Sequence, residues 1–196
     1  MIPKRIAIKF FASPDPGPAL DLGPAIDLFH GFIQGKKVEG LLIDVADYAH
    51  VPEGPGVVLI GHEVDYGIDR TGGRTGLLVT RKHFGETSLC DVLRDTLRKG
   101  LVAIRAIEED GSLQVRFAPD AVTLQFPDRL AAPNTDDAFK AIQAEIVPVF
   151  AELFGDAKHE ISRSNADDPG KLLTLSVEAK ETVGADALLA RLGAEA

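Results

Sequence analysis

The chain has 196 residues, of which 45% are hydrophobic and 26% charged, a balance typical of globular proteins that excludes a wholly disordered chain. Its formal net charge of −9 repels the phosphates of DNA and RNA, so we expect no nucleic-acid partner. No apolar run approaches the roughly 18 residues of a membrane span, so we expect no membrane partner. The single cysteine, Cys90, excludes a disulfide framework and suits a cytoplasmic protein.

The N-terminal segment predicts a strand followed by a helix. Residues 5–11, RIAIKFF, have the β-branched and aromatic composition of a strand. We interpret the charges of Lys4, Arg5 and Lys9 as solvated charges at the edge of a sheet. A proline-rich stretch follows, and a helix is expected from Pro24, in its first turn, to Gly35 at its end.

Three strands are predicted next, at 40–48, 56–69 and 75–82. Gly72 and Gly73 lie between the last two, and a Gly-Gly pair flanked by strands indicates a hairpin, because both central residues of a type I′ turn need positive φ. Counting outward from this pair fixes the register of the two strands.

That register divides the hairpin into two faces. One face is apolar and is expected to lie in the core; it carries Val64, Tyr66, Ile68, Leu77 and Val79. The other face is charged and is expected to meet solvent; it carries Glu63, Asp65 and Asp69. Here Glu63 lies opposite Lys82, and Asp69 lies diagonal to Arg74, so paired surface charges explain these acids.

A cluster of polar residues gathers near one end of the strand at 40–48. Asp44 and Asp47 precede His50 in a loop rich in proline and glycine, which is a common position for a functional site. His62 and Tyr66 point with the core residues, so their polar atoms need a partner or an opening. These five residues are candidates for an acid/base site, and the alternative is that the aspartates cap turns.

Two further sets of candidates lie in the same hairpin. His62 is expected to face His83, and such a pair supplies two ligands for a divalent metal but no complete site. Arg70 and Arg74 are candidates for holding an anionic ligand or substrate. The stretch at 62–66 begins like the zinc-protease motif H-E-x-x-H, but Tyr66 stands in place of the second histidine.

The rest of the chain continues to alternate between helices and strands. A helix is predicted at 88–107, with Ser88 and Asp91 as a capping box and Cys90 as a half-buried structural residue in its first turn. The next helix begins at Asn134 or Thr135, ends at Gly155 and is expected to bend or break at Pro148. The other predicted elements are a hairpin of 112–117 with 121–126, strands at 157–163 and 171–179, and a helix at 187–192.

Hairpins predominate in this order, so we predict an α+β fold with a mixed, mainly antiparallel sheet and helices packed on one face. We expect a single domain over 1–196, with a second lobe from about 110 to 196 as the alternative. The chain has no nucleotide-binding motif, and its cofactor is unknown. The preferred hypothesis is a non-catalytic domain that binds a small molecule or its own copy as a homodimer. The alternative is a hydrolase or lyase, with or without a divalent metal.

Overall fold

The computed structural model describes residues 3–51, 54–83, 85 and 87–193. Its strands are β1 (Ile6–Ala12), β2 (Leu42–Tyr48), β3 (Gly56–Gly61), β4 (Val64–Asp69), β5 (Gly76–Arg81), β6 (Phe117–Phe126), β7 (His159–Arg163) and β8 (Leu173–Ala179). Its helices are α1 (Gly23–Gly35), α2 (Leu89–Asp110), α3 (Asp136–Phe154) and α4 (Ala185–Arg191). Among the described residues, no helix combines the length and the hydropathy needed to cross a membrane.

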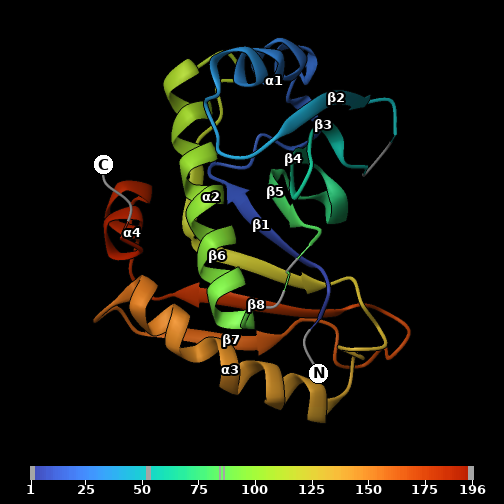
Figure 1. Ribbon diagram of the computed structural model, residues 1–196, viewed down its shortest axis with the longest axis vertical. Helices are drawn as coiled ribbons and strands as arrows, with labels where there is room; N and C mark the ends of the chain where they lie inside the picture. The colour runs from blue at the N-terminus through green and yellow to red at the C-terminus, as the bar shows by residue number, and fades with distance from the viewer. Residues whose placement is uncertain (1–2, 52–53, 84, 86, 194–196) are drawn as a thin grey trace.

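All the strands join one sheet in the order β2-β3-β4-β5-β1-β6-β8-β7, and every neighbouring pair is antiparallel (Figure 1). The predicted α+β class with hairpins is therefore confirmed. The N-terminal strand β1 lies in the middle, because β5 pairs with one of its sides and β6 with the other. Strands β6, β7 and β8 extend the same sheet, and one cluster of buried side chains runs through both halves of the chain.

The helices cover one face of this sheet. In Figure 1, α2 crosses the middle of the sheet, with α1 near the β2 end and α3 near the β7 end. Gly100 of α2 lies directly over the side chains of Phe10 and Val79, so a side chain at this position would meet the Phe10 ring. At the other end, the Phe154 ring of α3 lies 5.6 Å from the ring of His159 in β7. We call the opposite side of the sheet the open face.

The predicted register of the β4–β5 hairpin is confirmed. Ile68 lies opposite Leu77, and Tyr66 lies opposite Val79. Gly72 and Gly73 have φ values of 76° and 71°, the conformation that made glycine necessary at both positions. Tyr66 is only 1% exposed, so the apolar side of the hairpin faces the core as expected.

The prediction of a second hairpin between 112–117 and 121–126 is wrong. Only the last residue of the first segment is in a strand, because β6 runs without interruption from Phe117 to Phe126. Its N-terminal end pairs with β1 after a shift of register between Phe10 and Phe11. Strand β1 thus pairs with the side of β6 on which the segment 112–117 was expected to pair.

The helix caps follow local rules, whereas the expected break at Pro148 does not occur. The Ser88 hydroxyl accepts a hydrogen bond from the Asp91 N–H at 3.1 Å, and Thr135 does the same for Ala138 at 3.3 Å. Helix α3 continues through Pro148, which lies on its exposed side. The inward residues of α3, Val149 and Phe150, are fully buried, and their packing holds the helix together across the proline.

Candidate functional site

The candidate cluster at the end of β2 is exposed and is used by the local backbone. The Asp44 carboxylate accepts a hydrogen bond from the Val45 N–H at 2.8 Å, and Asp47 accepts one from the Ala49 N–H at 2.8 Å. His50 follows in an exposed turn. The contact of Asp47 is that of an aspartate that holds a turn, whereas Asp44 lies within β2, next to a shift in its register with β3.

His62 and His83 lie side by side, with their ring centroids 5.9 Å apart, and both are exposed. Within the described part of the chain, no group of three or more His, Cys, Asp or Glu residues is placed to hold a metal ion. Tyr66 lies in the core, as expected, but His62 does not, because the strand predicted at 56–69 is interrupted between β3 and β4, where His62 lies. Burial raises the pKa of the Tyr66 phenol, and the charges of Asp95 and Glu39 act in the same direction.

The two candidate arginines have different surroundings. Arg70 is half-buried, and its guanidinium donates to the Leu20 carbonyl oxygen, so it is bound to the loop before α1. Arg74 is exposed, and its guanidinium carbon lies 3.7 Å from the centre of the Phe11 ring. Only Arg74 is therefore placed to present its N–H groups to a ligand.

Cys90 is half-buried, and its thiol donates to the Glu145 carbonyl oxygen at 3.0 Å. Burial raises the pKa of this thiol, and the nearby Glu145 carboxylate adds to the effect. A raised pKa disfavours the thiolate, which agrees with a structural residue rather than a nucleophile.

The charged residues of the hairpin form ion pairs, but with partners other than those predicted. Lys82 binds Asp65 at 2.8 Å rather than Glu63, and Glu63 binds Arg81 at 2.9 Å.

Asp69 was expected at the surface, yet it is 1% exposed and binds Lys9 at 2.5 Å. Lys9 was expected to be a solvated charge at the edge of the sheet and is 8% exposed. The reason is topological: β1 enters the middle of the sheet, so its charge has neighbouring strands on both sides.

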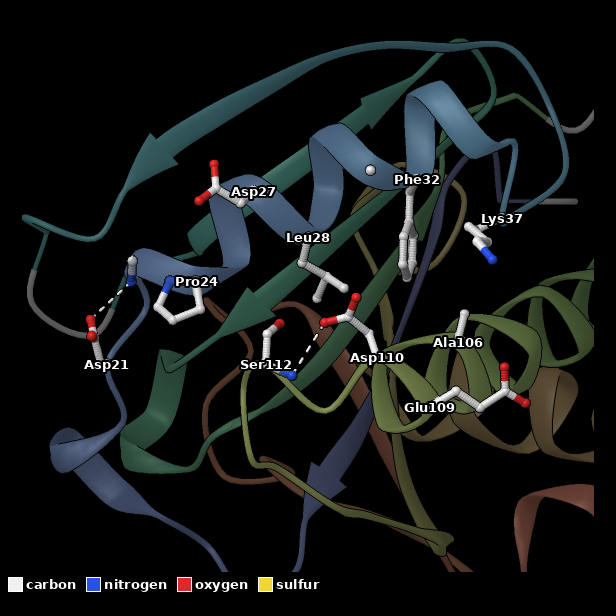
Figure 2. A pocket seen from close by; sticks show the side chains of 12 residues that line it. Asp21, Pro24, Asp27, Leu28, Phe32, Lys37, Ala106, Glu109, Asp110 and Ser112 are labelled. Carbon is white, nitrogen blue, oxygen red and sulfur yellow. Dashed lines mark hydrogen bonds between the residues drawn. The ribbon is translucent and has the colours of Figure 1, made fainter.

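A groove with a volume of about 670 Å³ lies between α1 and the C-terminal half of α2 (Figure 2). We call it the α1–α2 groove. In Figure 2, Leu28 and Phe32 point from α1 toward α2, and the Asp110 carboxylate faces them. Leu28 and Phe32 are 5% and 3% exposed, so they form an apolar lining rather than a free surface.

Charge in this groove is mostly negative. Asp110 accepts a hydrogen bond from the Ser112 N–H at 3.2 Å, which orients its carboxylate. Three more carboxylates, of Asp21, Asp27 and Glu109, lie around the opening. Lys37 is the one cation among the lining residues, so four carboxylates and one ammonium give a formal charge of −3.

The α1–α2 groove continues at both ends. A hollow of about 420 Å³ shares Asp21, Pro24 and Ser112 with it. A second hollow, of about 470 Å³, shares Lys37 and reaches Leu41 beside β2.

A second cavity lies on the open face and has a volume of about 270 Å³. We call it the open-face pocket. Its residues come from β1, β4, β5, β6 and the hairpin tip; they are Ala7, Lys9, Phe11, Asp69, Thr71, Gly72, Arg74, Leu78, Thr123 and Gln125. Of the residues predicted to bind a ligand, the pocket contains Arg74 and not Arg70.

Sequence reasoning missed most residues of both cavities. The one available signal was Lys9, a charged residue between the apolar residues Ile8 and Phe10 of the predicted strand. The walls of the α1–α2 groove come from residues 21–37 and 106–112, and no pattern in the sequence links these segments.

Comparison of the chain with family models, curated proteins and solved structures gives no match. The chemistry of the two cavities is therefore the basis for any function.

Proposed function

We propose that the protein is a non-catalytic binding domain whose α1–α2 groove takes a small organic cation with an apolar body. The observation that carries this proposal is the combination, in one cavity, of buried apolar side chains with four carboxylates. Its volume of about 670 Å³ falls within the range of roughly 300–1,000 Å³ typical of small-molecule sites.

Each part of the ligand has a counterpart in the groove. Pro24 and Ala106, which are half-buried, offer an apolar surface for the body of the ligand beside the buried Leu28 and Phe32. The Asp110 carboxylate faces the same space and is placed to accept a charge-assisted hydrogen bond from an ammonium group. The surrounding carboxylates attract a cation and repel an anion of the same shape.

Isothermal titration calorimetry with tryptamine tests the proposal, and indole-3-acetate serves as its anionic counterpart. We expect saturable binding of tryptamine and much weaker binding of indole-3-acetate. Asp110→Asn keeps the acceptor for Ser112 but removes the charge, and it should weaken tryptamine at least tenfold, as expected for a lost charge-assisted bond. Asp156→Asn, an exposed site beyond α3, is the matched control and should bind as the wild type does.

Gly31→Leu is a second test that does not change charge. Gly31 lines the groove, and a Cβ at this position would meet no atom within 4 Å, so a leucine is expected to reduce the space for a ligand. We expect a folded variant that no longer binds tryptamine. Unchanged affinity in this variant, or equal affinity of the wild type for indole-3-acetate, would contradict the proposal.

Self-association through β2 is a second candidate function. This strand is at the edge of the sheet; Leu41, just before it, and Ile43, within it, are 68% and 58% exposed. An exposed apolar edge strand is a template for pairing with another chain, here a second copy. Sedimentation velocity should show a dimer that Ile43→Lys converts to a monomer; a wild-type monomer at 100 micromolar would refute this candidate.

A further inference from the structure

The open-face pocket is lined by an ion pair whose side chains are largely buried. The side chains of Lys9 and Asp69 are 9% and 2% exposed, and their charged atoms are 2.5 Å apart. The Lys9 ammonium also donates to the Thr71 carbonyl oxygen at 2.8 Å. Asp69 accepts two more hydrogen bonds, from the Thr71 hydroxyl at 2.7 Å and the Thr71 N–H at 3.2 Å.

Several residues are arranged around this pair. The aliphatic part of Lys9 crosses Gly76, where a Cβ would lie 3.0 Å from the lysine Cε, so the neighbouring strand leaves room for the side chain. Stability alone does not explain the arrangement, because replacing a buried ion pair with apolar residues is often neutral or stabilising. The pair therefore needs another explanation, and its position in a pocket points to ligand binding.

The pocket has N–H donors available for a ligand. An ammonium group has three N–H donors, of which Asp69 and Thr71 take two in the described structure. Arg74 lies over the Phe11 ring and is exposed, so its N–H groups are accessible to a ligand. Two cations and one carboxylate give this pocket a formal charge of +1 in a chain whose net charge is −9.

The apolar part of the pocket lies beside these donors. Ala7, Phe11 and Leu78 contribute apolar surface from the central strands, and Thr123 and Gln125 contribute polar groups from β6. The volume of about 270 Å³ is below that of sites for drug-sized ligands. The pocket thus suits a small molecule with one charged end and a flat apolar body.

We propose that the open-face pocket binds a small carboxylate, with its anionic group between Lys9 and Arg74 and its apolar body against Phe11 and Leu78. This site is separate from the α1–α2 groove, which lies on the helix side of the sheet and has the opposite charge. The ligand gains charge-assisted hydrogen bonds from both cations, and a guanidinium matches the two oxygens of a carboxylate.

Calorimetry at pH 7 with benzoate tests the proposal. Benzamide is the neutral counterpart with the same body, and inorganic phosphate is an anion without that body. We expect saturable binding of benzoate, with benzamide and phosphate each at least tenfold weaker. Equal binding of benzamide would overturn the role of the charge, and equal binding of phosphate would overturn the role of the apolar surface.

Two variants identify the site. Arg74→Gln removes the exposed cation, leaves the buried pair intact and should weaken benzoate at least tenfold. Arg129→Gln makes the same change at an exposed position outside the pocket and should have no effect.

The double substitution Lys9→Met with Asp69→Asn removes the buried charges together and should also weaken benzoate at least tenfold. Because no carboxylate is left unpaired, this variant is expected to fold. Failure of benzoate to bind the wild type at 10 millimolar, or wild-type affinity in Arg74→Gln, would overturn the proposal.

Discussion

Replacing Lys9 with methionine removes the partner of a carboxylate that lies inside the sheet. Methionine keeps a side chain of similar length over Gly76, so the main change is the loss of the ammonium. Asp69 is then left buried, with only its bonds to Thr71. Its ionised form loses the charge that offsets its desolvation.

The structure sets the magnitude of this effect. Breaking a buried ion pair on one side costs about 3–5 kcal/mol. Because Thr71 continues to donate two hydrogen bonds to Asp69, we expect a loss near the lower end, about 3 kcal/mol. For a chain of 196 residues this corresponds to a melting temperature about 6–12 °C lower.

Urea unfolding at pH 7 measures the effect, and far-UV circular dichroism is the suitable signal because the chain has no tryptophan. Adding Asp69→Asn to the variant should recover most of the lost stability. Lys82→Met is the matched control: its partner Asp65 is 23% exposed, and we expect a cost below about 1 kcal/mol. A cost within 1 kcal/mol for Lys9→Met, or an equal cost for Lys82→Met, would refute the reasoning.

Three further predictions concern the core and the helices. Gly100→Ala should lower the free energy of unfolding by about 1–2 kcal/mol, because its Cβ meets the Phe10 ring. Gly31→Ala should raise the free energy of unfolding by about 0.5–1 kcal/mol, because its Cβ meets no atom and alanine favours the helix. Equal effects of the two substitutions in thermal melts would contradict this prediction. Tyr66→Phe should not destabilise the protein at pH 7, because its hydroxyl has no hydrogen-bond partner in the described structure. The pKa of the Tyr66 phenol is higher in the folded state than the value of about 10 in the unfolded state. The folded protein therefore loses stability as the pH rises above about 10, because ionisation of the phenol favours the unfolded chain. The wild type should lose more stability than Tyr66→Phe between pH 9 and 11. Ser88→Ala should cost about 1 kcal/mol through loss of the cap of α2, measured by urea unfolding, and a negligible cost would show that the cap does not contribute.

Local rules account for the features that were predicted correctly. The register of β4 and β5 was predicted by counting outward from Gly72 and Gly73, which lie midway between the paired residues Asp69 and Gly76. The starts of α2 and α3 follow from Ser88 and Thr135, whose hydroxyls bind N–H groups three residues ahead. In each case the interacting residues are close in sequence.

The candidate sites depended on contacts that only the tertiary structure decides. Lys9 and Asp69 are 60 positions apart, and their pairing requires β1 to enter between β5 and β6. Alternation of side chains along β1 predicts which face of the sheet Lys9 lies on. It does not predict that Lys9 is buried, because burial depends on the strands that lie on either side of β1.

The same limit applies to the α1–α2 groove. The sequence determined that α1 and α2 are helices and which side of α2 is apolar. It did not determine that Leu28 and Asp110 face one another, because helix packing depends on the sheet that supports both helices. The periodicity of apolar residues along a segment predicts whether the segment is a helix or a strand and which of its sides is buried. The shape of a cavity depends instead on the distance and angle between segments, which periodicity does not give.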